Sequence, residues 1–325
     1  MTSQPNPQAI MNEIIERLKK LGPKELLSYA IFNGEDEARY YAELAEKAKR
    51  KSVRALFKKM SRESKGHELL LRRTFERLFP GEEPVKVDIP PVEVYPFYPE
   101  FEKVEDYIRA LEYCMESELF AKRTYEILAG VAENEEVRRI AFELSEIEQN
   151  HYEEIKKVYD IVLYFELRQI FPDRLKFGAY LVTDDEKAKY ILPDMLTDNR
   201  EVIAVIREHP DKFRELTEID NVIWVSKISE EYPEKVVPPK FVPELKGELL
   251  KFLKSAKEKG KQGVIFIQNV GYLVVELGFR DALDFLFYIK DAAIVNNGFL
   301  IISANPDAFE KKEWGLLTSE FEVIL

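Results

Sequence analysis

The spacing of apolar residues changes at Pro172, and this change limits the chain to two kinds of structure in series. Before Pro172, apolar side chains recur at helical spacing over long stretches. After it, short β-branched or aromatic runs alternate with helical stretches, which indicates a mostly parallel sheet covered on both faces. The 325 residues suffice for two domains, each with its own core. We therefore predict a multi-domain chain, with an N-terminal helix in residues 1–22, an all-α four-helix bundle in 23–172 and an α/β domain in 173–325.

The helical part has the layout of a bundle with one long crossover. Residues 8–21 predict a first short helix that stops at Gly22-Pro23. Six prolines in residues 80–100 fix φ and remove donors, so this stretch predicts an extended connection. Short connection, long crossover and short connection is the helix order of ferritin-like bundles. The predicted bundle helices are 23–51, 52–79, 103–129 and 134–171.

The second part predicts alternating strands and helices. The expected strands are 178–183, 202–207, 221–225, 263–268 and 299–303. The expected helices are 185–196, 209–218, 243–259, 280–296 and 308–320. Asp184, Asp185 and Glu186 follow the first strand, where a phosphate-binding loop would need Gly, Lys and Ser or Thr. Asp184 and Asp185 could bind a cation at the carboxyl end of this strand, but we favour an N-cap role for them at the start of the next helix. We assign no catalytic residue in this part.

Composition excludes several classes of protein. The net charge of −12 divides evenly between residues 1–170 and the remainder, and no basic cluster predicts nucleic-acid binding. The start MTSQPNPQ lacks a signal peptide, and no apolar run reaches membrane-spanning length, so we expect a cytoplasmic protein without a membrane partner. Cys114 is the only cysteine, which excludes an internal disulfide and a rubredoxin-type site, and we expect it to be a small buried hydrophobic residue. The Glu and Lys excess, with only 17 Asn plus Gln, suits a heat-adapted source.

Carboxylates and histidines recur in the two halves of the predicted bundle. Glu35 is followed 32 residues later by His67, and Glu118 is followed 33 residues later by His151. Glu148 and His151 are three residues apart, so both side chains lie on one helix face, about 60° apart, where one metal can take both. Carboxylates can bridge hard cations, and histidine suits iron or manganese. The duplicated pattern predicts a metal site inside the bundle.

These residues resemble the rubrerythrin branch of the ferritin-like superfamily over roughly residues 23–160. The segments that carry the resemblance are NGEDEARYYAELAEKA, ESKGHELL, MESELFAKRTYEILAG and EIEQNHYEEI. The resemblance implies a di-iron centre that reacts with peroxide or dioxygen, with Glu35, His67, Glu118, Glu148 and His151 as ligands. It also implies an external electron donor such as a rubredoxin. The chain departs from the family pattern at Ser64, where a glutamate is expected three residues before His67, and Glu63 is a candidate replacement after a small helix rotation. Otherwise the site has five protein ligands and an open position, or binds one metal weakly.

Residues of about 178–325 resemble an archaeal family of unknown function, the one numbered 835. The segments that carry this resemblance are VIWVSKI, VVPPKFVPEL, GVIFIQNVGYLVVELGF and FLIISANPDAF. The resemblance implies a role in regulation or protein interaction.

Three hypotheses follow for the function. The first is a non-haem di-iron oxidoreductase of rubrerythrin type that binds two iron ions, with manganese or zinc as possible substitutes, and that forms a homo-oligomer. The second is a metal or redox sensor whose bundle signals to the α/β domain. The third is a structural bundle with a degenerate metal site, for which Ser64 is the best support.

Overall fold

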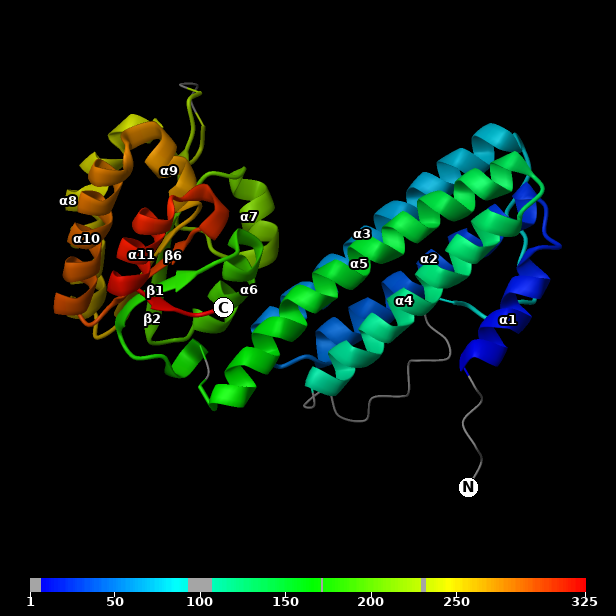
Figure 1. The fold of residues 1–325 in the computed structure, drawn as a ribbon, viewed down its shortest axis with the longest axis horizontal. Coiled ribbons are helices and arrows are strands. Elements are labelled where there is room, and N and C mark those ends of the chain that lie inside the picture. The colour runs from blue at the N-terminus through cyan, green and yellow to red at the C-terminus, as the bar shows by residue number, and fades with distance from the viewer. Residues whose placement is uncertain (1–6, 93–106, 171, 229–231) are drawn as a thin grey trace. The chain divides into compact units, whose positions relative to one another are not determined.

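The computed structural model describes residues 7–92, 107–170, 172–228 and 232–325, and it divides the chain into two compact units (Figure 1). The first unit comprises residues 1–162 and the second comprises residues 163–325. In the parts that are described, no helix is both long and apolar enough to span a bilayer.

The first unit is a bundle of long helices, as the sequence predicts. Figure 1 shows these helices running alongside one another. A shorter helix, α1 (Pro7–Leu18), packs against helix α4 (Tyr107–Val131). The four bundle helices are α2 (Pro23–Lys47), α3 (Lys51–Leu78), α4 (Tyr107–Val131) and α5 (Glu135–Arg168). Leu26, Ile31, Phe75, Leu128 and Ile140 belong to one buried cluster, so the apolar faces of all four helices contribute to a common core.

The connection between α3 and α4 is described as far as residue 92, and the described part contains no helix. Hydrogen bonds join it to α2, among them an ion pair between Lys24 and Glu82. The Tyr29 hydroxyl donates to the Pro90 carbonyl at 2.8 Å, and the Val85 amide donates to the Ser28 hydroxyl at 3.1 Å. The predicted extended crossover is confirmed for this part, whereas Pro96 and Pro99, and the predicted helix start at residue 103, lie outside the described residues.

The second unit contains a parallel sheet with the strand order β4-β3-β2-β5-β6-β1-β7. The five predicted strands are all present, and the two that the sequence analysis missed are the very short β4 and β7. The strands are β1 (Gly178–Val182), β2 (Arg200–Ile206), β3 (Val222–Val225), β4 (Lys235–Val237), β5 (Gln262–Ile267), β6 (Phe299–Ser303) and β7 (Glu322–Val323).

Helices cover both faces of this sheet. Alternate strand residues such as Ile203, Ile265 and Leu300 share a core with α8 and α10. On the other face, Phe213 of α7 stacks on Phe266 of β5 with ring centroids 6.1 Å apart. The helices are α6 (Asp185–Met195), α7 (Pro210–Thr217), α8 (Lys246–Glu258), α9 (Val270–Leu277), α10 (Phe279–Val295) and α11 (Lys311–Glu320). All were predicted except α9, whose apolar sequence runs on directly from β5.

Candidate metal centre

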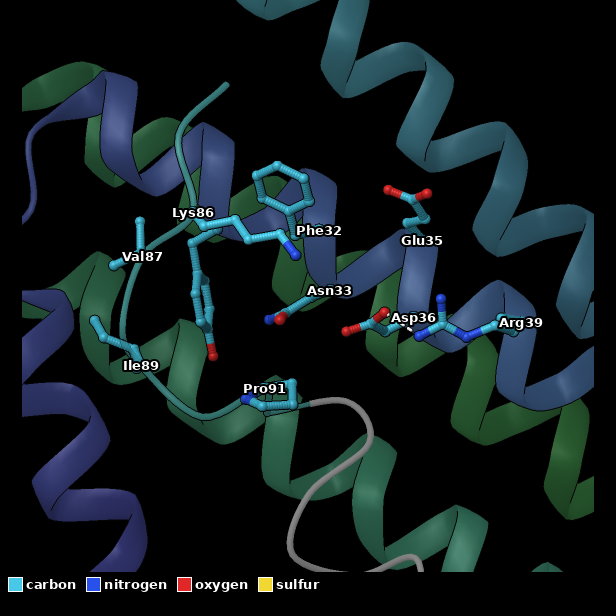
Figure 2. A pocket seen from close by; sticks show the side chains of 10 residues that line it. Phe32, Asn33, Glu35, Asp36, Arg39, Lys86, Val87, Ile89 and Pro91 are labelled. Atoms are coloured by element: carbon cyan, nitrogen blue, oxygen red, sulfur yellow. Dashed lines mark hydrogen bonds and ion pairs between the residues drawn. The ribbon is translucent and has the colours of Figure 1, made fainter. Parts of the chain in front are cut away.

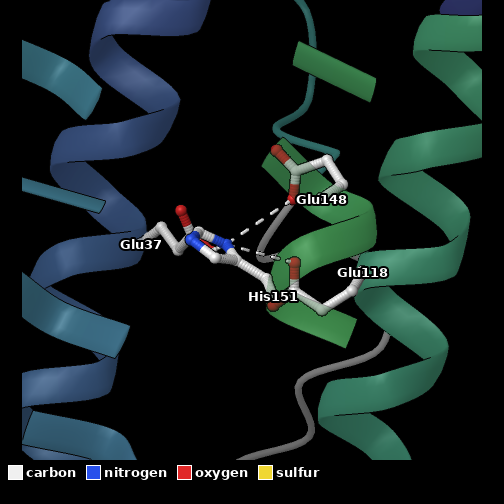
Figure 3. A group of neighbouring side chains, drawn as sticks. All are labelled: Glu37, Glu118, Glu148 and His151. Atoms are coloured by element: carbon white, nitrogen blue, oxygen red, sulfur yellow. Dashed lines mark ion pairs between the residues drawn. The ribbon is translucent and has the colours of Figure 1, made fainter. Parts of the chain in front are cut away.

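Four side chains from three helices meet inside the bundle (Figure 3). Glu37 comes from α2, Glu118 from α4, and Glu148 and His151 from α5. One potential ligand atom from each residue lies within 4.8 Å of all the others. From Nδ1 of His151, the nearest carboxylate oxygens are at 3.3 Å for Glu37, 3.6 Å for Glu118 and 4.0 Å for Glu148. The three carboxylates thus surround one imidazole.

The cluster is closed off from solvent. Each of the four residues is at most 3% exposed, so water cannot solvate the carboxylates. Oε1 of Glu37, Oε2 of Glu118 and both ring nitrogens of His151 make no hydrogen bond to any residue that the structure describes. Buried carboxylates that lie this close together are costly unless a cation compensates their charge. Oxygen ligands with one imidazole are a donor set that suits iron, manganese or zinc, so the residues fit a metal ion.

The pKa shifts of Glu37 and His151 also indicate that the cluster favours a positive charge. Burial raises the pKa of Glu37, and the neighbouring charge of Glu118 raises it further, although His151 opposes the change. Burial alone would lower the pKa of His151, but the carboxylates of Glu37 and Glu118 outweigh burial and raise it well above its usual range. These shifts favour protonated groups in the cluster, and a metal ion would displace the protons on binding.

Tyr41 forms a hydrogen bond to one carboxylate of the cluster. Its hydroxyl donates a hydrogen bond to Oε1 of Glu118, and its buried ring stacks on Phe57 with centroids 5.9 Å apart. Groups that bind the outer atoms of a metal ligand fix its orientation and tune its basicity. Cys114, one turn before Glu118, is fully buried, and burial raises the pKa of its thiol well above the usual range. The thiol stays protonated and acts as a small apolar residue, as predicted.

Comparison with known families agrees with this geometry. Residues 25–159 match the family Rubrerythrin, and residues 181–321 match the family described as "Protein of unknown function (DUF835)". The chain joins a rubrerythrin domain to a DUF835 domain. No curated protein matches the chain. Among solved structures, a hypothetical protein from Pyrococcus furiosus is 30% identical over 46% of this chain and 96% of its own, with a TM-score of 0.37.

Three of the six predicted ligands lie in the cluster of the rubrerythrin domain. Glu118, Glu148 and His151 meet there, whereas Glu35 does not. The Glu35 carboxylate lies 3.4 Å from Arg72, and its side chain is 46% exposed. Figure 2 shows it at the rim of a surface pocket of about 370 Å³ that includes Asp36.

Glu37 occupies the place that the sequence analysis gave to Glu35. Residues two apart on a helix point about 200° away from each other, so the two side chains cannot face the same way. Glu37 continues the buried stripe of α2 that includes Ala30, Gly34 and Tyr41. The sequence signal for Glu37 is therefore a glutamate that falls on the apolar stripe of its helix.

Glu63 and His67 lie outside the group of four. Glu63 is 39% exposed and lies 3.8 Å from the Lys59 ammonium, so it does not replace the carboxylate missing at Ser64. The His67 ring centroid is 5.3 Å from that of His151. Burial, and next the charge of His151, lower the pKa of His67 to about 4, so the ring is neutral at pH 7.

In the DUF835 domain, the acidic residues after β1 have structural roles. The Asp184 carboxylate accepts hydrogen bonds from the amides of Glu186 and Lys187 at the start of α6, which confirms the predicted cap. Asp185 accepts a hydrogen bond from the Ser303 hydroxyl. His209 is an exposed residue at a helix start, where it caps α7.

The sheet of this domain reverses its strand order between β2 and β5, and open α/β sheets bind ligands at the carboxyl ends of such strands. Here the polar groups bind one another. Gln268 accepts from the amide of Arg207 at 2.9 Å and donates to Glu208 at 2.9 Å, and the buried Lys189 lies 3.1 Å from Glu208. We assign no chemistry to this edge.

Proposed function

We propose that the rubrerythrin domain is a redox-active metal centre that reduces peroxide or dioxygen with electrons from an external donor protein. The observation that supports this function is the buried cluster of three carboxylates around His151, because a dry, anionic, histidine-containing site in a bundle stabilises a redox-active cation. A bound iron or manganese ion would supply electrons to the oxidant, and peroxide takes up two electrons and two protons to give water.

The chain contributes binding, orientation and exclusion of water. Glu37, Glu118 and Glu148 compensate the cation's charge, and His151 adds the nitrogen ligand. Tyr41 holds the Glu118 carboxylate in place. With Cys114 as the only cysteine, this sequence has no rubredoxin-type iron site, which supports an external donor protein such as a rubredoxin as the source of the electrons.

The test is peroxide consumption by protein that has been purified without oxygen and loaded with iron or manganese. We expect turnover with reduced rubredoxin, and we expect Glu118→Gln to abolish it. Glu35→Gln is the matched control, since it removes a carboxylate of the same bundle that lies outside the cluster. Turnover that Glu118→Gln leaves unchanged would contradict the proposal. Absence of bound metal would also contradict it and would indicate that the bundle has a structural role only.

A second candidate is a metal or redox sensor in which the state of the bundle is signalled to the DUF835 domain. The departure at Ser64 favours it, because a site with a reduced ligand set can bind metal without efficient turnover. A sensor predicts tight metal binding, no peroxide consumption with several donors, and a metal-dependent change in the sites of limited proteolysis.

A further inference from the structure

The rubrerythrin domain contains an internal duplication. A shift of 84 residues carries Tyr41 onto Tyr125 and His67 onto His151. It also carries the buried Val53 onto the buried Val137. The helix pair α2–α3 therefore corresponds position by position to the pair α4–α5, and each metal ligand in one pair has a defined counterpart in the other.

The carboxylates are not duplicated. Under the same shift, the counterpart of Glu118 is Gly34 and the counterpart of Glu148 is Ser64. Both residues are buried where α2 packs closely on α3, because a Cβ on Gly34 would lie 3.4 Å from Cβ of Glu68 and 3.7 Å from the carbonyl oxygen of Ser64. Small residues thus fill the two places where α2 and α3 would present carboxylates.

Glu37 does not restore the missing half. It lies three residues after Gly34, about 4.5 Å further along the helix, and its own counterpart is Ala121. Its carboxylate is the one closest to His151, at 3.3 Å, so it belongs with the ligands of the α4–α5 pair. All the carboxylates of the site therefore gather around one histidine.

We infer that this centre holds one metal ion, bound by Glu37, Glu118, Glu148 and His151, where the family pattern implies two. The inference rests on the metal-binding part of the proposed function. A complete two-metal site of this bundle type takes one Glu from each of two helices and a Glu-x-x-His pair from each of the other two. This chain has Glu37 on α2, Glu118 on α4 and the Glu148–His151 pair on α5, but it has Ser64 in place of the glutamate of the second pair, so a second ion would have His67 as its only unshared ligand.

Charge balance supports the same count. Three carboxylates carry a charge of −3, which one trivalent ion neutralises, and which one divalent ion together with a retained proton also neutralises. Two divalent ions would leave an excess of positive charge in a site that is at most 3% exposed, and uncompensated buried charge is strongly unfavourable.

The experiment is metal stoichiometry of the full chain after loading with excess Mn²⁺ and desalting. We expect one ion per chain, with the electron paramagnetic resonance spectrum of an isolated Mn²⁺ ion. Ser64→Glu restores the Glu-x-x-His pair on α3, and we expect it to raise the count to two with a spectrum of a coupled pair. Ser64→Gln, of the same size without the charge, should stay at one.

The outcomes separate this inference from the proposed function. Two ions in the unmodified chain would overturn the inference and leave the proposed function standing, whereas no bound ion would overturn both. If Ser64→Glu does not fold, the stoichiometry and spectrum of the unmodified chain still decide the question.

Discussion

The two helix pairs of the rubrerythrin domain share a frame but differ in chemistry. Tyr41 and Tyr125, like Val53 and Val137, occupy corresponding buried positions, so the two pairs bury side chains of the same kind at the same places. The pair α4–α5 keeps Glu118, Glu148 and His151 together, whereas α2–α3 has Gly34 and Ser64 at the first two of these positions. The comparison shows that packing positions and ligand positions are separable: replacing a ligand with a small residue leaves the helix stripe that builds the core intact.

Outside the cluster, carboxylates of the α2–α3 pair form ion pairs with lysine and arginine. The buried Glu68 on α3 pairs with Lys65 at 2.7 Å and also with Arg72, and Arg72 reaches Glu35 on α2. These carboxylates are compensated by basic side chains. By contrast, the carboxylates of Glu118 and Glu148 on α4–α5, together with Glu37, share a single histidine. A bound cation is therefore needed to compensate the charge of this cluster but not that of the Glu68 group.

The largest expected effect is a contrast between the two histidines. His151→Ala removes the imidazole at the centre of three carboxylates, and we expect metal affinity to fall by at least about 100-fold, since even the outer partners of metal ligands contribute about 10–100-fold. His67→Ala should change the affinity little. Isothermal titration with Mn²⁺ measures both, and an equal loss in the two variants would contradict the unequal roles of the helix pairs.

The next contrast lies within α2. Glu37→Gln removes a ligand, and we expect a loss of affinity of about 10–100-fold, whereas Glu35→Gln two residues earlier should leave binding unchanged because its carboxylate pairs with Arg72. The same titration, with circular dichroism to confirm folding, gives the answer. Loss of binding in Glu35→Gln would place the ligand where the family resemblance put it.

A smaller effect is expected for the residue that orients Glu118. Tyr41→Phe removes one donated hydrogen bond and keeps the ring, so we expect metal affinity to fall about 10-fold with little change in melting temperature. Tyr29→Phe is a matched control on the same helix, since that hydroxyl bonds the crossover at Pro90. If both variants bind metal alike, Tyr41 has a packing role only.

The smallest effect concerns an ion pair that links the two helix pairs. Glu154 on α5 is 2.5 Å from Lys59 on α3, and also 2.5 Å from Lys157. Burial raises the pKa of Glu154, but the bonds from Lys157 and Lys59 outweigh it and lower the pKa to about 2. A depressed folded-state pKa means that this stabilisation is complete above about pH 5 and is lost as the pH falls towards 2.

We therefore expect Glu154→Gln to destabilise the metal-free bundle near pH 7 by about 1–2 kcal/mol, after allowance for the partly exposed setting of the pair. Thermal melting at pH 7 and at pH 3 should show the gap between variant and parent narrowing in acid. A gap that stays constant between these pH values would mean that the charge of Glu154 contributes nothing.

Much of the fold could be read from the sequence because the signals are local. The helix spacing, Gly22-Pro23 and the prolines of the crossover define the bundle elements, and the five longer strands were found from their apolar runs. The two missed strands are two and three residues long, too short to carry a pattern, and they exist because neighbouring strands offer them partners.

The duplicated helix pairs and the pairing of Glu148 with His151 could be predicted from residue spacing, because spacing along a helix fixes which side chains share a face, and the family resemblance added Glu118 as a candidate ligand. The packed bundle was needed to show that Glu37 completes the cluster, that Glu35 and Glu63 lie outside it, and that Gly34 packs on α3 beside Ser64 and Glu68. Those facts depend on how each helix is rotated about its axis in the packed bundle. That rotation is set by contacts between residues far apart in the chain, not by the order of residues within one helix.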